Sequence, residues 1–449
     1  MRWSVLAVAL AVFFCEFAYY VLKVGLCNWA ALPAGSGGGA PSPLRLLLVS
    51  DVHVLGARRR LWVERAWVDW QLRKSFALLS WLTRPHAVLV LGDMLDEGGG
   101  FTGDALWHAY RERYGAVAGS GAVVGSGARG AGAPPHLHVV GNHDTGWAGR
   151  LSPWLIQRFE RSFGAANAAF AMRADGTIAA AAEFELAQRA SPAQRQALES
   201  VFAAAATDGF VLVRTNSMAL DGGAPAAVRQ QTLRFLRAVG EARGGAQQHR
   251  PAGGQPPLVL LTHMPLFRSD DRDCGAARAA EVGHVTYAAP GEPLGEDVVT
   301  KADTQWLLRT LRPSLVLSGH THTACFYVHE SEAAPASAPV QELWRRRWRD
   351  SGEWAGGGAG ADVPEDVPEL TASTLSWGMR PDPAFAVLSM ARGTAARGPT
   401  SVAARICSLP DERVIFGVYA LVAASVVAGA LARCFRSRRA DPPAGAKQH

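Results

Sequence analysis

The amino-acid sequence predicts a layered α/β fold in which several buried strands end at one polar site. Five short runs of apolar residues lack helical periodicity, as is typical of strands buried on both faces. Each run is followed by Asp, Asn or His. Ligands in layered α/β proteins gather beyond the carboxyl ends of the strands, so the five exits can converge.

The five strands recur along most of the chain, each with its own polar block. They cover residues 46–50, 87–91, 137–140, 258–261 and 314–318. The blocks that follow are Asp51-Val52-His53, Gly92-Asp93-Met94-Leu95-Asp96, Gly141-Asn142-His143-Asp144, Thr262-His263 and Gly319-His320-Thr321-His322. Mixed nitrogen and oxygen donors without thiolate favour Mn, Fe or Zn over a soft metal.

The number of donors predicts two metal ions. Asp51, His53, Asp93, Asn142, His263, His320 and His322 are too many ligands for one ion, and they fit two ions that share a carboxylate. Two adjacent metals are the known arrangement for in-line displacement at phosphorus. One block alone is weak evidence, but five buried polar exits without metal would leave Asp and His unpaired at high cost.

Two apolar segments bracket the predicted domain. Trp3 to Leu22 is long enough to cross a bilayer with Glu16 as its only charge, and Val414 to Ala432 carries no charge. Arginines after the second segment place both termini in the cytosol and the domain on the lumenal or extracellular side. A cleaved signal peptide is the alternative for the first segment. Glu16 is expected near the lumenal interface; a functional carboxylate deeper in the membrane is the alternative.

The expected division of the chain follows these segments. It comprises a first transmembrane helix with a short cytosolic start (1–24), a linker (25–43), the lumenal domain (44–395), a juxtamembrane segment (396–413), a second transmembrane helix (414–432) and a basic cytosolic tail (433–449). That tail holds much of the basic excess behind the net charge of +6, so the charge does not argue for nucleic acid.

Further elements are expected between the polar blocks. Helices are predicted at 61–82, 154–163, 224–242 and 302–311, and strands at 210–217, 369–376 and 384–389. The helix at 61–82 is rich in tryptophan, which we expect to pack against the sheet. Flexible loops are expected at about 115–133, 165–207 and 330–366. The second of these is interpreted as an insertion outside the core that carries a helix from Ser191 to Ala206.

Four cysteines lie outside the apolar segments. Cys27, Cys274, Cys325 and Cys407 would occupy a compartment that permits disulfides. Cys27 can pair with Cys407 and Cys274 with Cys325, but four cysteines allow three pairings and the sequence does not choose. No Asn-x-Ser/Thr sequon is present, so N-glycosylation is not expected.

The five blocks resemble the signature of the calcineurin-like metallophosphoesterase superfamily. That resemblance implies a four-layered α/β/β/α sandwich, here between two transmembrane helices. It implies that Asp51, His53 and His322 bind one metal, that Asn142, His263 and His320 bind the other, and that Asp93 bridges them. It also implies that His143 is the general acid and that Asp96 orients it.

A second set of motifs resembles the GPI-anchor-remodelling branch of that superfamily. The motifs are Phe14-Cys15-Glu16-Phe17, Cys27-Asn28-Trp29, Asp69-Trp70-Gln71, Arg158-Phe159-Glu160, Asn216-Ser217, His263-Met264-Pro265-Leu266 and the stretch from Val363-Pro364 to Trp377. The resemblance implies a phosphodiesterase that uses two divalent ions, most plausibly Mn²⁺, and removes ethanolamine phosphate from a mannose of the GPI glycan.

The same resemblance implies partners and a location. The substrates would be GPI-anchored proteins, with ER–Golgi cargo receptors as further partners. The chain would be a multi-pass membrane protein of ER exit sites, the ER–Golgi intermediate compartment and the cis-Golgi, with a lumenal catalytic domain. The lysine-based retrieval signal of the branch is only partly present, because residues 445–449 keep the single lysine Lys447.

Two other functions are compatible with the sequence. One is a lumenal phosphatase or nucleotide phosphodiesterase of the same fold. The other is a non-catalytic receptor for GPI-anchored cargo, which the complete set of blocks argues against. Arg268 follows the His263 block and is either a substrate contact or a surface arginine.

Overall fold

Two β-sheets form the centre of the molecule in the computed structural model. It describes residues 2–32, 42–119, 134–187, 191–248, 255–270, 274, 285–330, 353–357, 366–392 and 401–440. The first sheet has six strands in the order β12-β15-β14-β1-β2-β3. Their bounds are β1 (Leu44–Val49), β2 (Ala87–Val90), β3 (His136–His138), β12 (Glu353–Gly357), β14 (Ala384–Ala391) and β15 (Ser401–Ser408). Within it, β1, β2 and β3 are parallel.

The second sheet has seven strands in the order β11-β13-β10-β7-β6-β4-β5. Their bounds are β4 (Asn167–Met172), β5 (Ile178–Phe184), β6 (Phe210–Arg214), β7 (Leu258–Leu261), β10 (Leu315–Ser318), β11 (Cys325–Glu330) and β13 (Asp366–Thr371). Its central strands β6, β7, β10 and β13 are parallel. A small separate hairpin pairs β8 (Tyr287–Ala289) with β9 (Glu292–Pro293).

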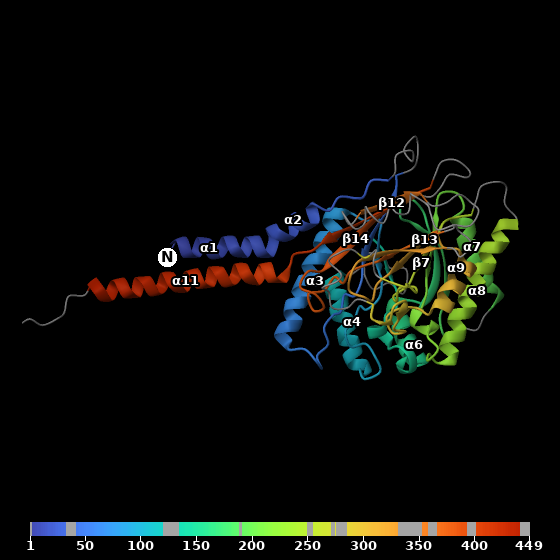
Figure 1. Cartoon of the computed structure of the whole chain (residues 1–449), viewed down its shortest axis with the longest axis horizontal. Helices are drawn as coiled ribbons and strands as arrows, with labels where there is room; N and C mark the ends of the chain where they lie inside the picture. The colour runs from blue at the N-terminus through green and yellow to red at the C-terminus, as the bar shows by residue number, and fades with distance from the viewer. Residues whose placement is uncertain are drawn as a thin grey trace, which may run out of the picture.

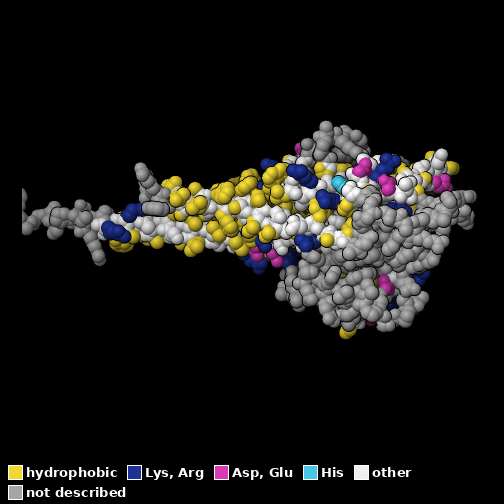
Figure 2. Space-filling view, turned by 90° about the horizontal axis from the view of Figure 1, so that it is seen from above, with side chains coloured by type: hydrophobic (Ala, Val, Ile, Leu, Met, Phe, Trp, Pro, Cys, Tyr) yellow, Lys and Arg dark blue, Asp and Glu magenta, His cyan; other side chains and the backbone are white. Residues whose placement is uncertain are grey.

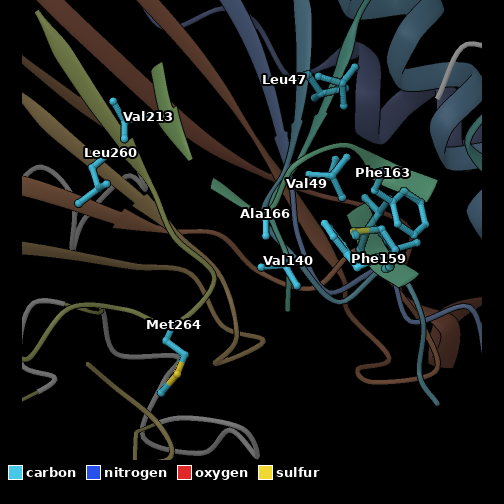
Figure 3. Close-up of a cluster of buried hydrophobic side chains, with 14 of the residues drawn as sticks. Leu47, Val49, Val140, Phe159, Phe163, Ala166, Val213, Leu260 and Met264 are labelled. Atoms are coloured by element: carbon cyan, nitrogen blue, oxygen red, sulfur yellow. The ribbon is translucent and has the colours of Figure 1, made fainter. Parts of the chain in front are cut away.

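The sheets pack face to face through alternating residues. Leu46 and Leu48 of β1 belong to the same buried cluster as Leu212 of β6 and Leu261 of β7. Leu47 and Val49, which point to the opposite face of β1, belong to the other cluster, which includes helix residues. Figure 3 shows Leu47 and Val49 with other members of that cluster. Each sheet therefore buries one face against its partner and the other under helices.

Helices cover both outer faces. Figure 1 shows α3 (Trp62–Thr83) and α4 (Asp104–Ala118) on one side of the sheets, and α7 (Pro192–Ala204), α8 (Ala226–Gln248) and α9 (Lys301–Leu311) on the other. The short α5 (Asn142–Thr145) and α6 (Pro153–Phe163) follow β3. This arrangement confirms the predicted four-layered α/β/β/α sandwich.

Two long apolar helices extend from the domain. The first consists of α1 (Arg2–Phe13), a π-helical turn (Phe14–Ala18) and α2 (Tyr19–Gly25), and the second is α11 (Glu412–Ala440). Residues Ser4–Gly25 and Glu412–Arg436 are long and apolar enough to cross a membrane. Figure 2 shows hydrophobic side chains along this rod and charged ones where it meets the domain. The two helices fit the predicted flanking transmembrane segments.

Residues 165–207 are not an insertion outside the core, contrary to our expectation. They contain β4 and β5, and β4 pairs with β6 in the second sheet. Alanine has little intrinsic preference for strands, and here pairing and packing decide the conformation. The expected helix in this stretch is confirmed as α7, whose Ser191 side chain accepts a hydrogen bond from the Gln194 amide.

Three other expectations about irregular segments are also changed. Residues 353–357, expected in a loop, form β12 and pair with β15. β15 lies beyond residue 395, the expected end of the domain, and pairs with β14. Residues 115–118 belong to α4. Residues 120–133 of that expected loop, most of 330–366 and residues 33–41 of the linker lie outside the described residues.

Trp67 of α3 packs against the core cluster as expected, but the other three tryptophans of α3 do not. The sheet-facing residues of α3 include Val68, Leu72, Phe76 and Leu79, whereas Trp62, Trp70 and Trp81 are exposed. Trp70 and Trp81 each lie two positions after a buried residue. That spacing places them about 200° around the helix, on its outer side.

Two disulfides connect distant parts of the chain. Cys27 pairs with Cys407, which joins the end of the first apolar helix to β15. Cys274 pairs with Cys325 at the start of β11. The sequence analysis named these two pairings as possible, but the sequence alone could not distinguish them from the other combinations.

Candidate metal centre

The five predicted strand exits meet where the two sheets lie together. β1, β2 and β3 deliver their blocks from the first sheet, and β7 and β10 deliver theirs from the second. Among the described residues, the blocks form three groups of potential metal ligands, each with its ligand atoms within 4.8 Å of one another. The first is Asp51, His53 and His322, and the second is Asp93, His263 and His320. The third, His53, Asp96 and His143, shares His53 with the first.

The first group combines β1 with the loop after β10. The Nε2 atoms of His53 and His322 are 3.2 Å apart. The Asp51 Oδ1 atom lies 3.8 Å from the first and 3.5 Å from the second. Three donor atoms from segments 269 residues apart thus face one point.

The second group includes the predicted amide ligand Asn142. Its Oδ1 atom lies 2.8 Å from His263 Nε2 and 3.0 Å from His320 Nδ1. The two histidine nitrogens are 3.2 Å apart. The Asp93 Oδ2 atom lies 3.4 Å from His263 Nε2 and also 3.5 Å from His53 Nε2. Asp93 therefore stands between the two groups.

Each carboxylate has one oxygen held and one left for a cation. Asp51 Oδ2 accepts hydrogen bonds from Ser50 Oγ and the His320 amide, and Asp93 Oδ1 accepts one from the His143 amide. The other oxygens, Asp51 Oδ1 and Asp93 Oδ2, are buried and have no hydrogen-bond donor among the described residues. Buried carboxylate oxygens without donors are costly unless a cation faces them.

Two of the histidines are oriented by main-chain carbonyls. His263 Nδ1 lies 2.8 Å from the Leu91 carbonyl, and His320 Nε2 lies 2.9 Å from the Glu296 carbonyl. Each contact occupies one ring nitrogen and turns the other toward Asn142. A histidine that binds a metal is ordinarily fixed in this way through its second nitrogen.

The backbone at the site is unusual. Asp51, His53, Asp93, His320 and His322 all have positive φ, between 44° and 73°. Residues other than glycine adopt this left-handed region at a cost, and such strain clusters at functional sites. Gly92 precedes Asp93 with φ 101°, and a Cβ atom there would lie 2.2 Å from His263 Nδ1. Only glycine lets the β2 exit approach His263 so closely.

Charge at the site favours cation binding. Burial raises the pKa of Asp93, but the facing histidines His263 and His143 outweigh it and hold the pKa below its usual range. Burial lowers the pKa of His263, but the Asp93 carboxylate outweighs it and raises the pKa to about 9. Burial and the neighbouring His263 lower the pKa of His320 to about 4. Asp93 therefore remains negatively charged and attracts positive charge.

His143 lies beside the ligand groups and contacts Asp96, the residue expected to orient it. Its Nδ1 atom is 2.7 Å from the main-chain carbonyl of Asp96, whereas the Asp96 carboxylate is 3.9 Å away. The contact that orients the ring is thus the Asp96 carbonyl. The side chain of His143 is about one-third exposed, in contrast to the buried His53 and His263.

Asp144 is a structural residue of the site that the sequence reasoning did not assign. Its carboxylate accepts hydrogen bonds from the amides of Asp93 (3.0 Å), Leu95 (3.1 Å) and Gly141 (3.0 Å). It therefore fixes the turn that carries Asp93 against the turn that carries Asn142. Its place at the end of the Gly-Asn-His-Asp block was the only available signal.

Comparison with known proteins agrees with this geometry. Residues 44–324 match the family model of the calcineurin-like phosphoesterases. The chain belongs to the calcineurin-like phosphoesterase family. It is 30% identical to Metallophosphoesterase 1 of Rattus norvegicus over 346 residues, which cover 74% of each protein. It is 26% identical to Metallophosphoesterase 1 of Ailuropoda melanoleuca over 429 residues, which cover 93% of this chain and 85% of that protein.

Membership of the calcineurin-like phosphoesterase family makes the chain a metal-dependent phosphoester hydrolase. Its donor set fits divalent ions on two grounds. The donors are imidazole nitrogens and carboxylate or amide oxygens, which suit first-row divalent metals. In addition, the unpaired oxygens of Asp51 and Asp93 face the donor groups.

Arg268 is not a surface arginine. It is fully buried, and its Nη1 atom donates to Thr371 Oγ1 on β13. The other expectation, a contact with substrate, stays a prediction.

Proposed function

We propose that this chain is a dimetal phosphodiesterase that removes ethanolamine phosphate from a mannose of the GPI-anchor glycan. The position of Asp93 between two sets of ligands is the observation that carries the proposal of two ions. The two candidate spans support a substrate that is itself membrane-bound. The choice of the GPI glycan is supported by the motif resemblance described above.

The candidate ligands would form two metal-binding sets. One ion would be held by Asp51, His53 and His322, the other by Asn142, His263 and His320, and Asp93 would serve both. Divalent ions there would neutralise phosphate charge and make hydroxide available near neutral pH. Mn²⁺ is our proposal for the native metal. The motif resemblance supports it, and the mixed nitrogen and oxygen donors are compatible with it.

His143 would supply the proton for the leaving oxygen. Burial lowers its pKa, but the carboxylate of Asp93 and the carbonyl of Asp96 outweigh burial and raise the pKa above its usual value. This shift favours the protonated form of the ring. Its Nδ1 atom is bound to the Asp96 carbonyl, so the Nε2–H is the group left to protonate the departing alkoxide.

The location proposed for the enzyme is the early secretory pathway. We place it at ER exit sites, the ER–Golgi intermediate compartment and the cis-Golgi, with the catalytic domain in the lumen. GPI-anchored proteins would be its substrates, and ER–Golgi cargo receptors would be its partners.

Hydrolysis by the full chain in detergent, with Mn²⁺ added, is the first test. A soluble phosphodiester and the matching phosphomonoester are compared, and His143→Ala serves as the inactive control. A GPI glycan carrying ethanolamine phosphate is then supplied, and ethanolamine phosphate is measured by mass spectrometry.

The outcomes separate the candidate functions. Release of ethanolamine phosphate by the natural chain but not by His143→Ala supports the proposal. Preference for the monoester would make the protein a phosphatase, and preference for a nucleotide diester would make it a nucleotide phosphodiesterase. Metal binding without hydrolysis of any of these would favour the non-catalytic receptor.

A further inference from the structure

The outer side of α3 carries a stripe of exposed aromatic and basic residues. Members recur every three or four positions, so they lie along one side of the helix. They are Ala66, Trp70, Arg73, Ala77, Trp81 and Arg84. Trp62 at the start of α3 is 74% exposed, and Trp81 is 61% exposed. The sandwich does not require these tryptophans, because its core uses other residues of α3.

α3 is joined directly to both candidate spans. The Glu16 Oε2 atom of the first span accepts hydrogen bonds from Trp70 Nε1 (2.7 Å) and Lys74 Nζ (2.6 Å). Trp67 Nε1 donates to Glu412 at the start of α11 over 2.8 Å. Figure 1 shows α3 lying across the domain ends of α2 and α11. The helix is therefore fixed at one height along the spans.

That height lies within about 10 Å of one edge of a bilayer. Glu16 also accepts a hydrogen bond from Tyr419 of α11, so Trp70, Glu16 and Tyr419 lie at one level. The helix from Tyr419 to Arg433 measures about 21 Å at ~1.5 Å per residue. A hydrocarbon core is about 30 Å thick. If Arg433 marks one boundary, the opposite boundary lies near the beginning of α11, where Trp67 contacts Glu412.

The composition of the stripe suits that depth. Tryptophan concentrates at the membrane–water interface, and amphipathic interfacial helices bury their apolar side about 5–10 Å below it. Arg73 and Arg84 alternate with the tryptophans and can reach anionic head groups. Figure 2 shows further Lys and Arg side chains around the junction of the rod and the domain.

We propose that α3 is a membrane-interface helix whose exposed stripe lies among the lipid head groups of the bilayer that holds the two spans. The proposal rests on the membrane embedding proposed above. It means that the catalytic domain rests on the membrane surface in one orientation. The partner of this surface is a phospholipid bilayer, and no second protein is required.

α3 is also connected to the metal centre. Its buried Gln71 donates from Nε2 to the Leu375 carbonyl (2.9 Å) and accepts from the Trp377 amide (3.2 Å). In the same segment, Thr374 Oγ1 donates to the Asp51 carbonyl over 2.6 Å. A helix seated on the membrane would thereby hold the first metal-ligand block at a fixed position relative to the lipid surface.

Spin labels on the full chain in lipid nanodiscs test this proposal. Nanodiscs of phosphatidylcholine and phosphatidylserine hold variants with one nitroxide each, and Cys434 is replaced by serine so that it does not take the label. Ala66→Cys and Ala77→Cys probe the stripe. Ala193→Cys on exposed α7 is the matched water control, and Val427→Cys on the exposed side of α11 is the membrane control. Collision rates with oxygen and with a water-soluble nickel chelate report the depth of each label.

The expected result is that labels at 66 and 77 collide with the nickel chelate several-fold less often than the label at 193. Equal nickel collision rates at 66, 77 and 193, with the label at 427 shielded, would overturn the α3 proposal and leave the spans intact. If 427 is also open to the chelate, the chain is not inserted and the membrane premise fails with it. Hydrolysis of a soluble diester by the same samples reports separately on the proposed enzyme.

Discussion

The Oδ2 atom of Asp93 lies 3.4 Å from Nε2 of His263 and 3.5 Å from Nε2 of His53. These histidines belong to different ligand groups and follow strands in different sheets, β1 and β7. One carboxylate oxygen is therefore the point at which the two sheets and the two groups meet.

Replacing Asp93 with alanine should empty the whole site rather than half of it. The change removes the shared negative charge from both groups, and first-row divalent ions need such charged ligands. We expect the purified full chain to lose most of both metal equivalents, measured by plasma mass spectrometry. Asp175→Ala, in an exposed turn, is the matched control. Retention of one full equivalent by Asp93→Ala would show that Asp93 does not serve both groups.

His143→Ala should separate catalysis from metal binding. His143 is outside the two ligand groups bridged by Asp93, so we expect metal content to stay near that of the natural chain. The rate should fall by roughly 10²- to 10⁴-fold, as for loss of a general acid. Parallel loss of metal and activity would contradict this role.

The Asp96 contact makes a second, finer prediction. Asp96→Asn keeps the main-chain carbonyl that holds His143 Nδ1, so it should retain much more activity than His143→Ala. The two variants are compared at equal metal content in the same assay. A loss as large as that of His143→Ala would mean that the Asp96 carboxylate, 3.9 Å from His143 Nδ1, orients the ring and that the carbonyl does not.

The site could be predicted from sequence because its chemistry is local. Each polar block follows a run of apolar residues, and a buried parallel strand has few other interpretations. The candidate ligands Asp51, Asp93 and His263 could therefore be named without knowing how the sheets pack. The sequence did not predict which atom of a residue makes each contact. That His143 contacts the carbonyl of Asp96, and not its carboxylate, depends on the path of a glycine-rich turn.

The fold could be predicted where the hydrophobic pattern determines the secondary structure. It could not be predicted where pairing with neighbouring strands determines it. β4 contains Asn167 and several alanines, and its strand character comes from β5 and β6 on either side. Trp62, Trp70 and Trp81 of α3 were misplaced because their residue type was given more weight than their position around the helix. The disulfides required the Cα atoms of Cys27 and Cys407 to be brought within 5.8 Å across 380 residues.

Asp144→Ala should weaken both the fold and the metal site. Three buried amides, those of Asp93, Leu95 and Gly141, would lose their acceptor. An unsatisfied buried donor costs about 1–3 kcal/mol. We expect a lower melting temperature of the metal-free chain and a weaker affinity for Mn²⁺. Asp144→Asn, which keeps one acceptor oxygen, should fall between. An alanine variant with unchanged melting temperature and metal affinity would contradict this.

Arg158 should act on catalysis by holding the turn that carries Asp96. Its guanidinium donates to the carbonyls of Thr102 (2.6 Å), Gly98 (2.7 Å) and Gly99 (3.2 Å), and it lies between the rings of Trp107 and Trp154. A lysine ammonium lacks the planar fork that allows these contacts.

Arg158→Lys should therefore lower the unfolding free energy by about 2–4 kcal/mol, since buried carbonyls lose their donors. It should also lower kcat more than it raises KM for a soluble diester, because the Asp96 carbonyl would no longer hold His143 firmly. Thermal unfolding and steady-state kinetics of the full chain measure the two effects. Arg161→Lys, at an exposed position of the same helix, should change stability by no more than about 0.5 kcal/mol. If Arg158→Lys melts earlier but keeps its kcat, Arg158 stabilises the fold without positioning His143.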